Sequence, residues 1–309
     1  MGKLRDLLRR RPGPVAAVLS GGGNHGAVQV GMLRALAEHD IRPELVVGTS
    51  IGALNGVAYA QDPTLAGIGR LDHLWRGLGG AGIFPSSWLN ALALARKGAA
   101  IHSNDRLRGM VEGILEVERF EDLPIRFQCV ATDVEHAREV WFSAGDLVDP
   151  ILASAALPGV LPAVEIDGIS YLDGAIVNDV PISRAVELGA TTIYVLHCGT
   201  IDRPRPDPRR PIDVVVQAYW VARHHRFKRD LETLPAGVEA IVLPTGATPT
   251  LRYNDFTRSG ELLDAAYAAS NQFLDGVVDE GGPLPRDSRP EGAASRDAEG
   301  VASDGDEAR

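Results

Sequence analysis

Short apolar runs alternate with longer amphipathic segments over most of the chain. The run at 15–20 precedes a helical pattern at 26–39, and the run at 44–49 precedes another at 50–61. Short apolar runs predict strands that are buried on both faces, and the segments between them are long enough for helices that cross back over a sheet. The alternation predicts an α/β fold whose mainly parallel sheet is covered by helices on both sides.

The same kinds of segment continue toward the C-terminus. Further strands are predicted at 125–134, 138–143, 191–198 and 238–243. Further helices are predicted near 103–116, 146–156, 181–189, 212–232 and 257–279. Neither a repeat nor a linker interrupts this series, so we expect a single domain over residues 15–279.

The two ends of the chain differ from this middle. Residues 1–14 carry five basic side chains and one acidic one, and such an arm suits an anionic membrane surface or plain solvent. The apolar stretch that follows the arm is too short for a signal peptide or a membrane anchor. Residues 280–309 have almost no large apolar side chains, so we expect a disordered acidic tail.

Composition and charge narrow the classes of function. Of 309 residues, 45% are hydrophobic, as in folded domains, and the net charge of −10 argues against a protein that coats nucleic acid. Cys129 and Cys198 lie singly in apolar runs, which predicts neither a disulfide framework nor a zinc site. No run reaches the roughly 18 apolar residues of a membrane span. We expect a cytoplasmic protein, with peripheral membrane contact left open.

A glycine-rich segment follows the first predicted strand. Gly21, Gly23 and Gly26 satisfy GxGxxG between a strand and a helix, the spacing of a dinucleotide-binding loop. A Rossmann-like nucleotide-binding module would also need an acidic residue at the end of the second strand, where the sequence has Thr49 and Ser50. This alternative is therefore weakened. An oxyanion hole made of backbone N–H groups, or a purely structural turn, fits the glycines equally well.

A second glycine motif follows the second predicted strand. Residues 48–52 read GTSIG, and GxSxG between a strand and a helix is typical of a nucleophile elbow. In such an elbow Gly48 and Gly52 relieve the crowding around Ser50. The two motifs follow successive strands, at the carboxyl ends where open α/β sheets bind ligands. We therefore interpret Ser50 as a nucleophile.

A nucleophilic serine needs a base, because its hydroxyl is almost entirely protonated at neutral pH. Asp173 ends an alternating apolar run, and Gly174 after it suits a close backbone approach. Asp167 and Gly168 lie between two short apolar segments and are interpreted as the turn of a hairpin. Asp173 is therefore the predicted base.

Four sequence blocks together resemble the patatin-like phospholipase family. They are GGGNHG at 21–26, GTSIG at 48–52, ASAALP at 153–158 and DGAIVNDVP at 173–181. Their ordered combination is more specific than any single motif. The resemblance implies a three-layer α/β/α fold and the hydrolysis of acyl esters of lipids, with no metal and no other cofactor.

The resemblance also implies roles for single residues. Ser50 would be the nucleophile and Asp173 its partner, in a dyad without histidine. The oxyanion hole would be formed by backbone amides drawn from Gly21, Gly22, Gly23, Asn24 and Gly26. A catalytically silent scaffold is disfavoured because both dyad residues are present.

His25 departs from the family, because it stands where Arg or Lys is usual. A histidine is charged only below a pKa of about 6.5, so His25 is either a conditional cation or a neutral residue that packs the loop. His197 is a rival third catalytic residue, because Ser50, Asp173 and His197 follow the chain order of an α/β-hydrolase triad.

Two further segments of the sequence allow more than one interpretation. Residues 77–102 are glycine-rich and then apolar, which suits an acyl-chain pocket, a lid or a core-packed helical hairpin. Residues 221–231 are basic and suit either anionic lipid head groups or the solvated face of a helix.

Overall fold

The computed structural model describes residues 13–81, 103–199, 207–209, 211–247, 249, 251 and 255–280. The expected basic arm and acidic tail lie almost entirely outside the described residues. So do residues 82–102, which contain most of the glycine-hinged apolar segment.

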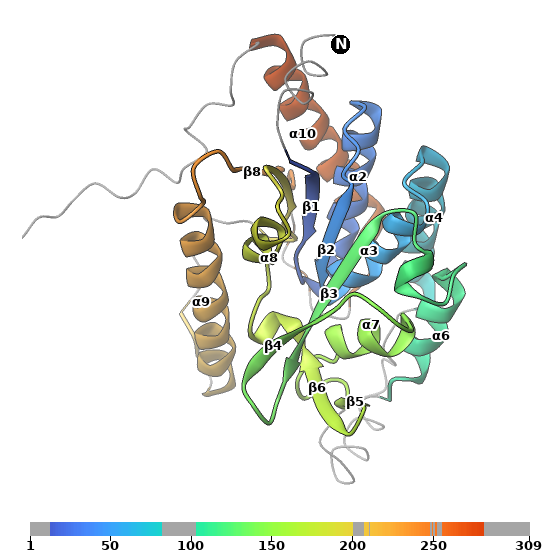
Figure 1. The fold of residues 1–309 in the computed structure, drawn as a ribbon, viewed down its shortest axis with the longest axis vertical. Helices are drawn as coiled ribbons and strands as arrows, with labels where there is room; N and C mark the ends of the chain where they lie inside the picture. Colours follow the sequence, from blue (N-terminus) through green and yellow to red (C-terminus); the bar gives the residue numbers. More distant parts are fainter. Residues whose placement is uncertain are drawn as a thin grey trace, which may run out of the picture.

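A mixed sheet runs through the centre of the molecule (Figure 1). Its order is β5-β6-β3-β2-β1-β7-β8, and β4 pairs with β3. The strands are β1 (Val15–Leu19), β2 (Leu45–Thr49), β3 (Arg126–Asp133), β4 (Arg138–Phe142), β5 (Val164–Ile166), β6 (Ile169–Asp173), β7 (Thr192–Leu196) and β8 (Glu239–Val242). β1, β2, β3, β7 and β8 are parallel, whereas β4, β5 and β6 pair in antiparallel fashion. The predicted mainly parallel sheet is therefore confirmed.

Helices cover both faces of the sheet, giving three layers (Figure 1). The first face is covered by α2 (Ala27–Glu38), α3 (Ile51–Gln61), α4 (Leu65–Ala81), α6 (Asp105–Ile114), α7 (Val148–Ser154) and α10 (Ser259–Glu280). The second face is covered by α8 (Ile182–Glu187) and α9 (Pro211–Glu232). Short 3₁₀ helices are η1 (Gly23–Gly26), η2 (Phe120–Asp122) and η3 (Gly174–Ile176).

The central strand β1 shows why the sheet lies between two helical layers. Ala17 and Leu19 pack into the core under α2 and α3, while Ala16 and Val18 pack into a separate core under α8. All four side chains are fully buried. A strand that is buried on both faces has no polar alternation, which explains its continuous apolar sequence.

Most predicted elements are observed with slightly shorter ends, although α9 begins one residue earlier and α10 ends one residue later than predicted. The helix α4 was not predicted. The strand predicted at 191–198 stops at Leu196, because the chain then turns so that the Cys198 amide donates to Ser20 Oγ at 2.9 Å. The hairpin prediction is confirmed: Asp167 and Gly168 join β5 to β6 with φ angles of 52° and 77°. Two consecutive positive φ angles are typical of a tight two-residue turn.

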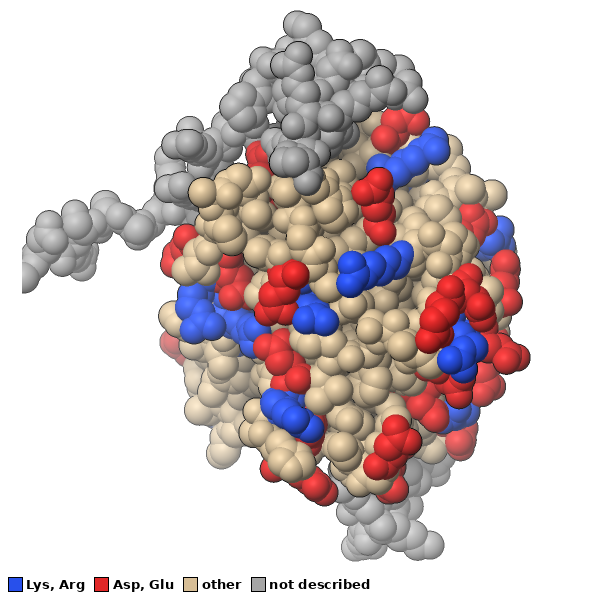
Figure 2. Space-filling model, in the orientation of Figure 1, with Lys and Arg blue, Asp and Glu red and all other residues tan. Residues whose placement is uncertain are grey.

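The basic segment at 221–231 lies on α9. On the face of the molecule drawn in Figure 2, acidic and basic side chains are interspersed rather than separated by sign. Within the described part of the chain, no helix combines the length and the apolar character that crossing a bilayer requires.

Candidate active site

Two strands that lie end to end bring Ser50 and Asp173 together. β4 pairs with residues 129–133 along one edge of β3, so β2 and β6 share the other edge. β2 ends where Thr49 faces Val130, and Asp173 faces the next residue of β3, Ala131. Ser50 Oγ, immediately after β2, donates a hydrogen bond of 2.6 Å to Asp173 Oδ2.

Ser50 lies on a strained turn between β2 and α3. Its φ of 56° and ψ of −123° lie outside the regions that side-chain-bearing residues favour. A Cβ on Gly48 would lie 2.4 Å from the Gly52 carbonyl oxygen, and one on Gly52 would lie 2.3 Å from the Leu19 carbonyl oxygen. Both glycines are therefore required by close backbone packing, as expected of an elbow.

Asp173 is held rigidly in the protein interior. The residue is only 1% exposed. The second oxygen of its carboxylate, Oδ1, accepts a hydrogen bond of 2.8 Å from the Ala175 amide. Thr132 Oγ1 donates to the Asp173 carbonyl at 2.8 Å. A Cβ on Gly174 would lie 2.2 Å from the Val130 carbonyl oxygen, so the close approach expected at this glycine is present. The carboxylate therefore has one defined position relative to Ser50.

Burial raises the pKa of Asp173 to about 6. The hydrogen bonds from Ser50 and Ala175 and the positive charge of Arg223 oppose this effect and favour the carboxylate. A carboxyl group with a pKa near 6 is still mainly ionised at pH 7, and it is a stronger base than an ordinary aspartate. This position of the pKa suits general-base chemistry.

The block at 153–158 holds the backbones of both residues. Ser154 Oγ, which is fully buried, accepts a hydrogen bond of 3.0 Å from the Ser50 amide. The Ala156 carbonyl accepts one of 3.0 Å from the Asp173 amide. The block was recognised in the sequence, but no function could be assigned to it. A serine in an apolar helix does not indicate which backbone group its hydroxyl will bond to.

The block at 173–181 reaches both glycine motifs. Thr49 Oγ1 donates to the Asn178 carbonyl at 2.9 Å, and the Gly21 amide donates to the Asp179 carbonyl at 3.1 Å. The Gly21 amide is therefore occupied. The expectation that it contributes to an oxyanion hole is corrected: Gly21 is needed because a Cβ there would lie 2.5 Å from Asp179 Oδ1.

The glycine loop presents two amides near Ser50. Gly22 is half-buried and Gly23 is exposed, and among the described residues neither N–H has a hydrogen-bond partner. Gly23 has a φ of 58°, which favours glycine, and a Cβ on Gly22 would lie 2.2 Å from Cys198 Cβ. A Cβ on Gly21 would lie 3.4 Å from Ser50 Cβ, so the loop lies directly against the serine. Such an arrangement can receive a developing negative charge.

The other two residues expected at the oxyanion hole pack the loop. Asn24 Nδ2 donates to the Asp255 carbonyl at 2.7 Å, which ties the loop to the segment before α10. Gly26 closes the loop against Ile51 and Trp75, where a Cβ would lie 2.5 Å from Ile51 Cγ1.

His25 is a half-buried neighbour of this loop. Its Nδ1 lies 3.1 Å from Asn24 Oδ1, and burial lowers the pKa of the ring below its ordinary value, against an opposing backbone contact at Pro249. The ring is therefore neutral at neutral pH. These observations favour the packing interpretation over a conditional cation.

A permanent cation near the site is Arg223, which lies on α9. Arg223 forms an ion pair with Asp179, and its guanidinium lies 5.0 Å from the centre of the Tyr219 ring. Burial opposes the charge, yet Asp179 and Tyr219 hold the pKa of Arg223 above its ordinary value. The sequence placed a basic segment here, but a run of basic residues does not show which one points inward.

His197 lies apart from the Ser50–Asp173 contact. Its ring stacks on Phe227 with centroids 5.1 Å apart, and its Nδ1 lies 2.8 Å from the Gly199 carbonyl oxygen. Burial lowers the pKa of this ring. Among the described residues no hydrogen bond joins His197 to Asp173, whose two oxygens already accept from Ser50 and Ala175. The geometry is that of a direct pair rather than of a triad.

Residues 17–186 match the family model described as patatin-like phospholipase. This match covers more than half of the chain and includes all four sequence blocks.

Two curated relatives are fungal lysophospholipases. The chain is 31% identical over 207 residues to Lysophospholipase nte1 of Aspergillus terreus, covering 66% of this chain and 13% of the relative. It is 27% identical over 307 residues to Lysophospholipase NTE1 of Coccidioides immitis, covering 91% of this chain and 19% of the relative. The chain thus spans less than a fifth of the length of these two proteins.

Two solved structures are similar at a lower level. VipD from Legionella pneumophila has a TM-score of 0.45 and 16% identity, with 86% of this chain and 67% of that chain covered. Human GIVD cytosolic phospholipase A2, in complex with methyl gamma-linolenyl fluorophosphonate, has a TM-score of 0.46 and 12% identity, with 90% and 61% covered. Similarities at this level carry no functional conclusion.

Proposed function

The chain belongs to the patatin-like phospholipase family, and from this premise we propose that it hydrolyses acyl esters of lipids with a Ser50–Asp173 dyad. The observation that carries the proposal is the 2.6 Å hydrogen bond from Ser50 Oγ to the buried Asp173 Oδ2. A nucleophile and a base in direct contact need no intervening histidine.

The first half of the reaction forms an acyl-enzyme. Ser50 Oγ attacks the acyl carbonyl carbon while its proton passes to Asp173 Oδ2, and the carbonyl oxygen becomes an oxyanion. The N–H groups of Gly22 and Gly23 stabilise that oxyanion. When the tetrahedral intermediate collapses, the bond to the alcohol breaks, and the departing oxygen takes the proton from Asp173.

The second half releases the acid. A water molecule gives a proton to Asp173 and attacks the acyl carbon, which forms a second oxyanion at the same two amides. Collapse of this intermediate breaks the bond to Ser50 Oγ, which recovers its proton from Asp173. The fatty acid leaves, and the dyad returns to its starting protonation state.

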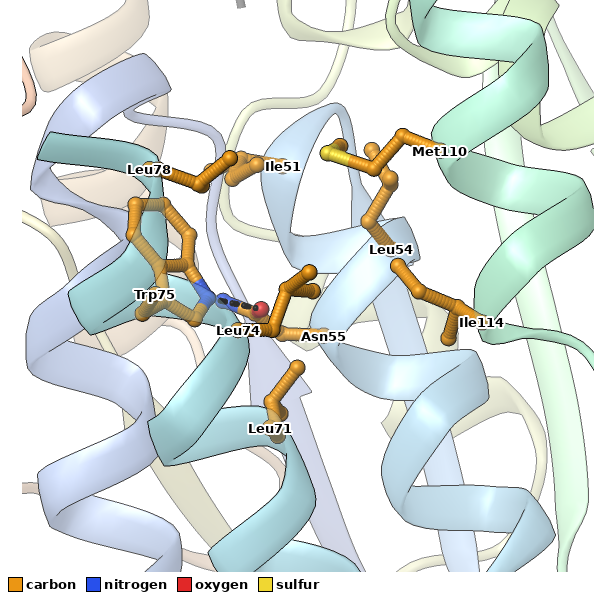
Figure 3. A pocket seen from close by; sticks show the side chains of 9 residues that line it. All are labelled: Ile51, Leu54, Asn55, Leu71, Leu74, Trp75, Leu78, Met110 and Ile114. Carbon is orange, nitrogen blue, oxygen red and sulfur yellow. Dashed lines mark hydrogen bonds between the residues drawn. The ribbon is translucent and has the colours of Figure 1, made fainter. Parts of the chain in front are cut away.

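A narrow apolar pocket lies next to Ser50, and it would have to widen to hold the acyl chain that we propose binds there. Figure 3 shows this narrow pocket between α3, α4 and α6, with Ile51, the residue after the nucleophile, among its lining side chains. The remaining lining residues are Leu54, Asn55, Leu71, Leu74, Trp75, Leu78, Met110 and Ile114. Because the two fungal relatives are lysophospholipases, a lysophospholipid is the first substrate to test.

We also propose that the protein contacts lipid surfaces peripherally, because its lipid substrates would lie in such surfaces. Four valines on α9 are at least half exposed, and this helix also carries Arg223 into the site; the valines are Val214, Val215, Val216 and Val221. We further propose that residues 15–279 form one catalytic domain, flanked by a basic arm and an acidic tail.

Hydrolysis of lysophosphatidylcholine and of a short p-nitrophenyl ester tests the proposal. Ser50→Ala and Asp173→Asn should abolish both activities, while the matched controls Ser103→Ala and Asp167→Asn retain them. Ser103 is exposed, and Asp167 occupies a turn whose positive φ asparagine tolerates. Full activity in Ser50→Ala would reject the proposed function. The described residues offer no observation that favours the nucleotide-binding alternative, since the residue after β2 is the hydrogen-bonded Ser50.

A further inference from the structure

Two buried amide side chains lie between the glycine loop and the elbow helix. Gln29 on α2 is 0% exposed, and Asn55 on α3 is 1% exposed. Gln29 Nε2 donates to the Ser20 carbonyl at 2.8 Å and to the Leu196 carbonyl at 3.0 Å. Asn55 Nδ2 donates to the Gly26 carbonyl at 3.0 Å and to Gln29 Oε1 at 2.8 Å. All four amide hydrogens are therefore satisfied.

Trp75 on α4 fixes the orientation of both amides. Its Nε1 donates to Asn55 Oδ1 at 2.9 Å, the bond drawn in Figure 3. Because an indole N–H can only donate, the Asn55 oxygen must face Trp75, and its nitrogen must face Gly26 and Gln29. Gln29 then presents its own nitrogen to the two backbone carbonyls. We call Trp75, Asn55 and Gln29 the amide relay.

The amide relay reaches both ends of the glycine loop. Ser20 immediately precedes the loop and Gly26 ends it, so the carbonyls on either side of Gly22 and Gly23 are each held by a buried amide. Asn55 belongs to α3, which begins directly after Ser50. The relay is thus a continuous set of hydrogen bonds from the elbow helix to the loop.

On the basis of the proposed function, we propose that Gln29 and Asn55 are positioning residues that hold the Gly22 and Gly23 N–H groups in register with Ser50. Hydrogen-bond donors stabilise an oxyanion best when they need no rearrangement at the moment of reaction. A loop that loses this support still binds the neutral ester but stabilises the oxyanion poorly. The loss should therefore appear in kcat rather than in KM.

Gln29→Met and Gln128→Met form a matched pair for the test. Gln128 is 3% exposed and accepts from Arg184 Nε at 2.9 Å, on the face of the sheet covered by α8. Each variant replaces a buried glutamine with a side chain of similar size, but only Gln29 bonds to the loop. In Gln29→Met we expect kcat for the p-nitrophenyl ester to fall about 10- to 100-fold, with KM within about threefold of the parent. In Gln128→Met kcat should stay within about twofold.

A trifluoromethyl ketone carrying an alkyl chain supplies the readout that a purely structural role would not move. Ser50 Oγ adds to its carbonyl carbon, the carbonyl oxygen becomes an alkoxide, and the serine proton passes to Asp173. The adduct mimics the tetrahedral intermediate, so its Ki in Gln29→Met should rise by the factor by which kcat/KM falls. Its Ki in Gln128→Met should be unchanged.

Trp75→Phe keeps the test decisive if Gln29→Met does not fold. Phenylalanine still packs a ring against Gly26 but lacks the N–H that orients Asn55, so we expect a several-fold loss of kcat with a matching rise in Ki. Unchanged kcat and Ki in a folded Gln29→Met or Trp75→Phe protein would overturn the positioning role. Retained activity in Ser50→Ala would instead reject the proposed function, which separates the two failures.

Discussion

Ser50 and Asp173 are 123 positions apart in the sequence, yet Ser50 Oγ lies 2.6 Å from Asp173 Oδ2. The contact exists because β2 and β6 follow one another along a single edge of β3. β2 pairs with β3 up to Val130, and β6 pairs with β3 from Ala131 onward. Asp173 is the last residue of β6. The positions of Ser50 and Asp173 relative to one another are therefore fixed by the register of one strand.

Asp173→Asn should remove activity while stabilising the fold. Asparagine can still accept from the Ala175 amide, but it cannot take the serine proton, so we expect a loss of at least about a thousandfold in kcat. Burial raises the Asp173 pKa to about 6 in the folded state, above its unfolded value. The carboxylate therefore destabilises the folded state at pH 7.5, by at most about 3 kcal/mol.

Thermal unfolding measured between pH 4 and pH 7.5 checks whether the ionised Asp173 carboxylate destabilises the folded state. The melting temperature of Asp173→Asn should equal or exceed that of the parent at pH 7.5, and the difference should shrink as the pH falls from 6 toward 4. In that range the parent regains its proton and the penalty disappears. A large drop in melting temperature at pH 7.5 would mean that Asp173 is chiefly a structural residue.

The pH profile of kcat/KM should have an acidic limb near pH 6. Asp173 must be ionised to accept the serine proton, and its pKa is about 6, so activity should be lost as the pH falls through that value. Esterase rates between pH 4.5 and 8.5 measure the limb. It should persist in His25→Gln, because Asp173 is the group that titrates and the His25 ring contacts Asn24 instead. A limb that vanishes in this variant would assign the titration to the histidine.

His197→Ala distinguishes the dyad from a triad. The His197 ring stacks on Phe227 and contacts the Gly199 backbone, so we expect turnover to stay within about tenfold of the parent. Steady-state esterase kinetics with circular dichroism as the folding control give the comparison. A loss as large as that of Asp173→Asn in a folded protein would establish a triad.

Arg223→Gln should shift the acidic limb upward. The change removes a cation that lowers the Asp173 pKa and leaves the buried Asp179 carboxylate unpaired, and both effects raise that pKa. Loss of one partner of a buried ion pair should also cost about 3 kcal/mol of stability. The double variant Arg223→Gln/Asp179→Asn should recover most of the stability. A limb that stays in place in Arg223→Gln would show that Arg223 does not influence the base.

The sequence predicted the parts of the site that depend on local chain geometry. A strand, a GxSxG and a helix together indicate an elbow, and an apolar run ending in Asp173–Gly174 indicates a candidate base next to a close backbone approach. The amide of Gly21 was misassigned because its partner, the Asp179 carbonyl, is more than 150 residues away.

The supporting residues could not be predicted in the same way. Gln29 and Asn55 are polar residues within apolar helical patterns, and such positions carry no information about which carbonyls they meet. Ser154 and Arg223 likewise act through partners set by tertiary packing. The identity of these contacts depends on strand order and helix placement, which the periodicity of one sequence does not specify.

Reaction with a fluorophosphonate, followed by peptide mass spectrometry, tests the central claim most directly. An activated serine attacks phosphorus and displaces fluoride, so the label marks the nucleophile whatever the lipid substrate is. We predict one label per chain, on the peptide that contains Ser50, and none on Ser50→Ala. Labelling should be slowed strongly in Asp173→Asn but not in Asp167→Asn. Labelling at another serine, or no labelling of the folded parent protein, would contradict the assignment of Ser50 and Asp173.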